Sequence, residues 1–96
     1  MENLNRFDVA EYSGILAVVV ESTLLPRDES VVVIPLLLAY PAVRHLNPEI
    51  MVDGRRLILA TRLIGAARRT ALRPVGSVAD QADRITRAVD VLMGGV

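Results

Sequence analysis

The fold is decided by residues 14–36, GILAVVVESTLLPRDESVVVIPL, in which two apolar runs flank a short polar segment. The first run, residues 14–22, is rich in β-branched valine and predicts a buried strand. The polar residues 26–30, PRDES, are typical of a turn, because proline fixes one torsion and Asp and Ser bond nearby backbone groups. Residues 31–34 predict a second strand. Pro35 cannot donate to a strand ladder, so we expect it at a strand end, an edge or a bulge.

Working outward, the clearest local signal downstream is a hairpin. Asp53-Gly54 lies between two apolar-rich runs, residues 49–52 and 55–61. The Asp-Gly dipeptide favours the type I′ turn of a two-residue hairpin loop. The preceding segment, residues 37–47, is ambiguous and is consistent with a short helical or an irregular excursion.

Two further segments are weaker strand candidates. Residues 6–12, RFDVAEY, are short and mixed and are consistent with an added edge strand. Residues 69–73 are consistent with another strand, which Pro74 would close.

The last segment predicts a helix. Ser77 and Asp80 have the spacing of a capping box, and Pro74 and Gly76 break the chain before them. Apolar residues then recur at the spacing of one helical face, at Val78, Ala82, Ile85, Val89 and Leu92. The pairs Asp80–Arg84 and Asp83–Arg87 have the i,i+4 order that stabilises a helix.

Near its C-terminus this apolar stripe widens to include Ala88, Val89, Val91, Leu92 and Met93. A helix that covers a single core does not need so wide a stripe, so we expect it to contact a second subunit as well. Several strands, a hairpin and one C-terminal helix predict an α+β fold, mainly β, with an antiparallel sheet in one domain, residues 1–96.

Composition narrows the class of protein. Of the 96 residues, 52% are hydrophobic, only three are aromatic and none is cysteine, which excludes disulfides and cysteine-based metal sites. The N-terminus lacks the pattern of a signal peptide. The longest apolar run, residues 31–40, is half the roughly 20 residues that a membrane span needs. We therefore expect a soluble cytoplasmic protein with no membrane contact.

Charge is balanced overall but divided between the halves. Residues 1–53 carry eight acids and three arginines, whereas residues 54–96 carry eight arginines and three acids. Arginine without lysine suits guanidinium contacts, although a GC-rich genome explains it as well. A neutral total argues against general nucleic-acid binding, which usually needs a basic domain.

The chain shows little sign of catalytic chemistry. His45 is the only histidine, so nucleophilic dyads and zinc sites are not expected, and we assign His45 to a surface loop. No glycine-rich phosphate loop occurs. The residues alone predict a non-enzymatic interaction domain that dimerises and needs no cofactor or metal. Its arginine cluster is either a solvated face or a surface for an acidic peptide or phosphate: Arg55, Arg56, Arg62, Arg68, Arg69 and Arg73.

The order of these motifs resembles the CcdB family of bacterial toxins from type II toxin–antitoxin pairs. Residues 18–25, the loop 26–30 and Val-Ile-Pro-Leu at 33–36 are similar to the family's first strands. Residues 46–61, LNPEIMVDGRRLILAT, are similar to its Leu-x-Pro strand and hairpin, and residues 85–96 to its C-terminal helix and Gly-aliphatic close. The resemblance spans essentially the whole chain.

This resemblance implies an SH3-like antiparallel barrel with a C-terminal helix, as in MazF/Kid-type toxins. It implies a homodimer whose helix ends meet near the two-fold axis, which fits Val89, Leu92 and Met93. It also implies a target, the DNA gyrase A subunit, and a CcdA-like antitoxin with a disordered tail that folds on binding. We assign antitoxin contact to Arg55, Arg56 and Arg62.

The resemblance places gyrase contact at the last three residues, Gly94, Gly95 and Val96. Well-known members end Trp-Gly-Ile, so Gly95 matches the glycine, Val96 matches the isoleucine, and Gly94 stands at the tryptophan position. A glycine has no aromatic face to stack on an arginine, a contact worth about 0.5–2 kcal/mol.

Two other functions remain open at this point. One is a non-toxic homologue that acts only as an antitoxin-binding module, which Gly94 favours. The other is a MazF/Kid-like endoribonuclease that uses Arg69, Thr70 and Arg73, although the Gly-Asp-Ile-Val opening of that family is missing.

Overall fold

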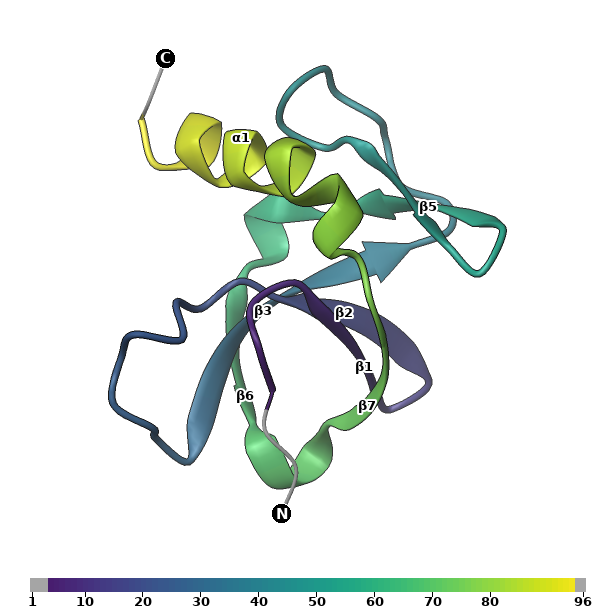
Figure 1. The fold of residues 1–96 in the computed structure, drawn as a ribbon. Coiled ribbons are helices and arrows are strands. Elements are labelled where there is room, and N and C mark those ends of the chain that lie inside the picture. Colours follow the sequence, from purple (N-terminus) through teal and green to yellow (C-terminus); the bar gives the residue numbers. More distant parts are fainter. Residues whose placement is uncertain (1–3, 95–96) are drawn as a thin grey trace.

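Seven antiparallel strands form one curled sheet, a half-barrel, and a C-terminal helix packs against it (Figure 1). The computed structural model describes residues 4–94. The strand order is β4-β5-β3-β2-β1-β7, and β6 pairs with β3 beside this path. The strands are β1 (Asp8–Tyr12), β2 (Ile15–Val19), β3 (Ser30–Leu37), β4 (Glu49–Val52), β5 (Arg55–Leu59), β6 (Gly65–Arg68) and β7 (Arg73–Ser77). The helix α1 (Ala82–Leu92) follows, and three 3-10 turns lie between elements: η1 (Thr61–Leu63), η2 (Arg69–Ala71) and η3 (Ala79–Gln81).

The two apolar runs that open the sequence analysis form the centre of the sheet, β2 and β3. β3 pairs with β2 along one side and, on its other side, first with β6 and then with β5. Pro35 lies inside β3 at the point where this second partner changes, and not at a strand end. The Val32 carbonyl accepts a hydrogen bond from the Val20 N–H, directly after β2. Backbone groups of successive residues point to opposite sides of a strand, so the nitrogen of Pro35, three residues later, points away from β2. The missing N–H therefore falls where the ladder is interrupted.

The central strands are buried on both faces, which explains why their sequence is apolar without polar alternation. Alternate residues enter two clusters: in β2, Val18 joins the larger core while Ala17 and Val19 join the smaller one. The larger core also takes residues of β4, β5 and the helix, among them Ile50, Leu57, Leu59, Ile85 and Ala88. The smaller core is built on the opposite face, with Leu4, Val31, Val33 and Leu72.

Both hairpins turn on two residues with positive φ. Asp53 (50°) and Gly54 (77°) confirm the predicted type I′ turn between β4 and β5. Ser13 (50°) and Gly14 (80°) form an equivalent turn between β1 and β2, where the sequence pattern predicts only the start of a strand.

Two weaker strand predictions are wrong in position. The N-terminal strand β1 exists but lies inside the sheet, because β7 pairs with its outer side. Residues 69–73 are not a strand. Arg69–Ala71 form η2, which separates β6 from β7. Pro74 sits within β7, where an edge strand with a register shift beside Val9 tolerates it.

The helix begins later than the sequence predicts. The Ser77 hydroxyl oxygen accepts a hydrogen bond from the Ala79 N–H, but this starts η3, and α1 begins only at Ala82. Ile85 and Ala88 are fully buried on the core side. The ion pairs within residues 4–94 do not include Asp80–Arg84 or Asp83–Arg87, and Arg84 instead donates to the Glu49 carbonyl.

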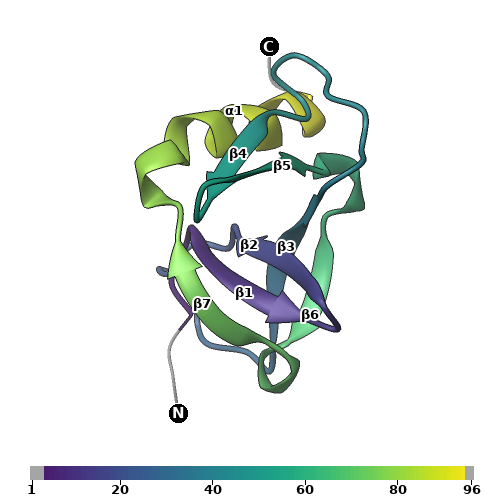
Figure 2. The same ribbon diagram turned by 90° about the vertical axis from the view of Figure 1, so that its right-hand side faces the viewer.

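The segment between β3 and β4 is irregular, which is one of the two alternatives that the sequence predicts. Residues 38–48 form a loop held by a bridge between Val43 and Asn47, with exposed His45 at its turn (φ 68°). Both views place α1 beside the β4–β5 hairpin (Figures 1 and 2). Among the described residues, no helix is long and apolar enough to cross a membrane.

Candidate functional site

The exposed end of α1 is the first candidate surface. The Met93 N–H donates to the Val89 carbonyl, and the Met93 residue is 74% exposed. Gly94 follows with a backbone φ of 91°. This left-handed conformation is the usual way in which glycine ends a helix. The predicted gyrase-contact residues Gly95 and Val96 lie outside the described residues, while Gly94 is exposed at the point where the chain leaves the helix.

The predicted dimer residues differ in what they contact within the protomer. Val89 packs against the larger core, and Leu92 is partly buried. Met93 projects from the molecule. Only Met93 is therefore fully available for a second subunit, and Val89 and Leu92 have part of their surface left to contribute.

The arginines assigned to antitoxin contact do not form one patch. Arg55 and Arg56 are exposed at the start of β5, beside the Asp53-Gly54 turn, and Arg62 is exposed in η1 beyond the other end of that strand. β5 is five residues long, roughly 17 Å of extended chain, and Arg62 lies three residues beyond its end. Arg55 and Arg56 can act together, whereas Arg62 belongs to a different part of the surface.

The other three arginines of the cluster form ion pairs with carboxylates of the same chain. Arg69 forms an ion pair with Glu21 at 3.8 Å, and the two side chains are only 14% and 15% exposed. Its Nε donates to the Asp28 carbonyl at 2.6 Å, and its backbone N–H donates to Glu29. Arg69 therefore fixes the loop between β2 and β3 and is not free to bind a phosphate.

Neighbouring arginines are also paired. Arg73 bonds the Glu11 carboxylate on β1, opposite which it lies in the sheet, and Arg68 pairs with Glu29 at 3.7 Å. The set proposed for ribonuclease chemistry, Arg69, Thr70 and Arg73, thus contains two arginines that are held by carboxylates. This arrangement favours a structural role for these arginines over catalysis.

The loop that Arg69 holds carries an apolar surface that sequence reasoning missed. Leu24 and Leu25 are both exposed, in a turn where the Ser22 hydroxyl oxygen accepts from the Leu24 N–H at 3.1 Å. Two leucines inside an otherwise polar loop were the available signal.

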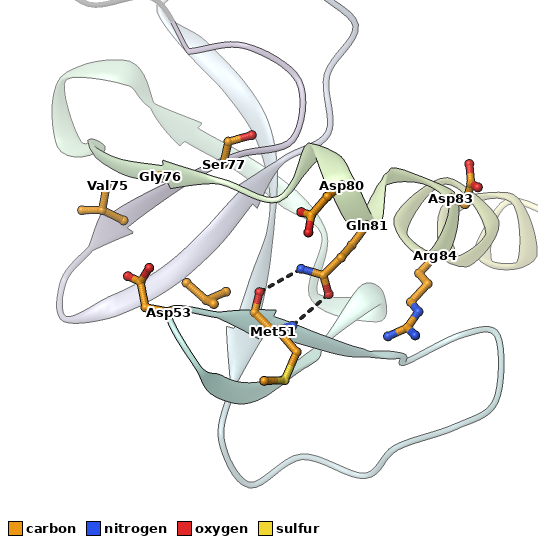
Figure 3. A pocket seen from close by; sticks show the side chains of 10 residues that line it. Met51, Asp53, Val75, Gly76, Ser77, Asp80, Gln81, Asp83 and Arg84 are labelled. Carbon is orange, nitrogen blue, oxygen red and sulfur yellow. Dashed lines mark hydrogen bonds between the residues drawn. The ribbon is translucent and has the colours of Figure 1, made fainter.

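A cleft of about 620 Å³ lies between the β4–β5 hairpin and β7, with η3 and the start of α1 at one end (Figure 3). A second hollow of about 580 Å³ lies between the 42–48 loop and α1, and Arg44, His45 and Arg87 line it. Within residues 4–94, no group of three or more metal-ligating side chains is close enough together to hold a metal ion.

Comparison with known proteins was informative at the level of the family. The family model described as CcdB protein matches residues 6–95 of the chain. A search of curated proteins found no match. The family match covers all strands, the helix and the Gly94-Gly95 pair, so the fold predicted from the resemblance and the observed half-barrel agree.

Proposed function

Because the chain belongs to the CcdB family, whose members are toxins of toxin–antitoxin systems, we propose that it binds the DNA gyrase A subunit, inhibits gyrase and is neutralised by a cognate antitoxin. The observation that carries this proposal is the family match over residues 6–95, which includes both the sheet and the helix that bears the tail. On this proposal the protein acts in the cytoplasm, by binding and not as an enzyme.

The proposed gyrase contact is the C-terminal tail, Gly94, Gly95 and Val96. Its support is the exposed end of α1, where Met93 and Gly94 leave the protomer's own core. A tail without an aromatic ring offers only backbone groups and one aliphatic side chain. We therefore expect gyrase binding to be weaker than a tryptophan at position 94 would give.

We propose a homodimer as the active form, with Val89, Leu92 and Met93 at its interface. The support is the apolar surface that these residues leave uncovered at the end of an 11-residue helix. Burying a half-exposed apolar stripe against its copy gains roughly 25 cal/mol per Å².

For the antitoxin, the exposed pair Arg55 and Arg56 gives the charged surface that a disordered acidic segment would need. Arg62 lies apart from this pair and would contribute only to a segment long enough to follow β5. An antitoxin tail that folds on binding can span such a distance.

The direct test is gyrase supercoiling and DNA cleavage with purified protein, with and without removal of residues 95–96. We expect the full chain to inhibit supercoiling and the shortened chain to lose most of that inhibition. The matched control is Arg87→Ala, which alters an exposed residue elsewhere on α1 and should inhibit like the full chain. Full-length protein that leaves gyrase unaffected would refute the proposal for that gyrase.

A second function is favoured by one specific observation, the glycine at position 94. A homologue without the tail's aromatic contact would retain the antitoxin surface and act only as a binding module. Tight antitoxin binding together with absent gyrase binding identifies this case.

A further inference from the structure

The cleft beside η3 lies between two edge strands of the sheet, β4 and β7. β4 and β7 are the first and last strands of the order, so each has one side with no strand neighbour. Their residues face each other across the cleft of about 620 Å³, Met51 to Asp53 on one wall and Val75 to Ser77 on the other (Figure 3). A free strand edge offers backbone groups that can pair with another extended chain.

The β4 edge is already satisfied by side chains of η3 and α1. The Gln81 carboxamide bonds both backbone groups of Met51, accepting from its N–H at 2.9 Å and donating to its carbonyl at 2.8 Å (Figure 3). Arg84 covers the next outward group, the Glu49 carbonyl, at 3.2 Å. Gln81 therefore takes the place that a neighbouring strand would occupy.

The β7 edge is open by contrast. The Val78 N–H points toward the β1 side of the sheet and donates to the Phe7 carbonyl at 2.8 Å. The Ser77 carbonyl shares a peptide with the Val78 N–H and therefore points the opposite way. In an extended chain the Ser77 N–H points to the same side as the Ser77 carbonyl, so both groups point away from β1. The Ser77 side chain points away from the cleft (Figure 3). Beside it, Gly76 has no side chain, and nothing lies within 4 Å of the position that a Cβ would take.

The walls of the cleft define what kind of chain would fit. Met51 and Val75 are exposed apolar side chains, one on each wall. Asp53 and Asp80 extend into the gap from different sides (Figure 3). The ion pairs found within residues 4–94 involve Glu11, Glu21 and Glu29 and leave both of these aspartates without an arginine partner. An extended segment that alternates basic and aliphatic residues matches both features.

We propose that the β7 edge is a docking site at which an extended, basic segment of the antitoxin, distinct from the acidic segment proposed for Arg55 and Arg56, adds as an eighth strand. Its backbone pairs with Ser77, its aliphatic side chains contact Met51 and Val75, and its basic side chains lie against Asp53 and Asp80. Strand addition of this kind takes affinity from main-chain hydrogen bonds and selectivity from alternate side chains. The identity of the partner rests on the proposed function, whereas the site itself does not.

The test uses a synthetic ten-residue peptide of alternating lysine and valine and follows binding by NMR of the ¹⁵N-labelled full chain. We expect the Ser77 amide to shift and to gain protection from hydrogen exchange. Ser77→Pro removes the outward N–H without touching the ladder to β1 and should weaken binding about fivefold or more. Ser77→Ala is the matched control, because it loses the same hydroxyl but keeps the N–H, and it should bind like the original chain.

A second pair of variants tests the charge argument. Asp80→Asn should weaken peptide binding, whereas Asp90→Asn, on an exposed part of α1 outside the cleft, should not. Equal binding by Ser77→Pro and Ser77→Ala, or edge-to-edge self-association in place of peptide binding, would overturn the proposal. Gyrase inhibition by the same samples separates the two hypotheses: inhibition without peptide binding leaves the toxin function intact and refutes only the docking site.

Discussion

At the residue scale, the largely buried ion pair between Arg69 and Glu21 shows how one side chain organises a loop. The guanidinium spans the gap between η2 and the β2–β3 loop and bonds a carboxylate and the Asp28 carbonyl there. Glu21 also accepts from the Val32 N–H at 3.3 Å, so the pair joins the loop to the start of β3. The loop's exposed Leu24 and Leu25 are thereby held on a fixed support.

Arg69→Ala should lower the free energy of unfolding by about 2 kcal/mol, because the largely buried Glu21 carboxylate loses its cationic partner and keeps only the Val32 N–H. Urea unfolding followed by circular dichroism measures this change. Arg68→Ala is the control: its pair with Glu29 is exposed and should contribute about 0.5 kcal/mol or less. Equal effects from both variants would show that the Arg69 pair is not structural.

Gly94 carries the other residue-scale prediction. Gly94→Trp should increase gyrase inhibition, because it restores an aromatic face at the proposed contact. The left-handed backbone at this position costs a side chain about 1 kcal/mol, so the gain will be partly offset.

Gly94→Ala carries the same backbone cost without the ring and is the control for a gyrase supercoiling assay. If the tryptophan variant folds and dimerises but inhibits no better than the alanine variant, then either the tail alignment is wrong or gyrase is not the target.

At the element scale, α1 depends on the sheet for its stability. An isolated helix of 11 residues is marginal in water, so its persistence rests on burying one face. Ile85 and Ala88 supply that face, and both join the larger core with residues of five strands. The helix that presents the tail is therefore only as rigid as this contact.

Ile85→Ala should destabilise the protein by about 3 kcal/mol, since it removes a fully buried side chain and leaves a cavity. Thermal unfolding monitored by calorimetry measures the loss. The control, Arg87→Ala on the exposed face of the same helix, should change stability by about 0.5 kcal/mol or less. A small effect of Ile85→Ala would mean that the helix is held by other contacts.

At the scale of the whole molecule, the half-barrel presents its exposed apolar side chains in separate places. Met93 at the end of α1 and Leu38 after β3 are almost equally exposed, at 74% and 73%. Only the first lies at the proposed two-fold interface. This pair therefore distinguishes a specific dimer contact from general surface hydrophobicity.

Met93→Asp should shift the protein from dimer to monomer, because two carboxylates would meet at an apolar contact near the two-fold axis. Sedimentation equilibrium measures the shift. Leu38→Asp, which introduces the same charge at a matched exposed position, should leave the dimer unchanged. A dimer that persists in Met93→Asp would place the interface elsewhere.

The elements whose signals are local can be predicted from the sequence alone. Two apolar runs around a polar loop, the Asp53-Gly54 turn and the 3-4 spacing along residues 82–92 follow from backbone geometry and side-chain periodicity, and the structure has all three. Their order along the chain was also enough to identify the CcdB family. The predicted element boundaries are less accurate. The helix starts later than predicted because the η3 turn precedes α1.

Which segments meet depends on contacts between residues that are far apart in the chain. β1 is an interior strand because β7, distant in sequence, pairs with it. Residues 69–71 form a 3-10 turn, from which Arg69 bonds Glu21 and the Asp28 carbonyl. The arginine cluster is thereby divided into three kinds of residue: the largely buried Arg69, the exposed but ion-paired Arg68 and Arg73, and the exposed Arg55, Arg56 and Arg62. The Gln81 hydrogen bonds to Met51 also join residues far apart in the chain, and they lie across the cleft from the free edge at Ser77. Such long-range pairing leaves no periodic signal in the sequence, so the roles of these residues can be inferred only from the folded structure.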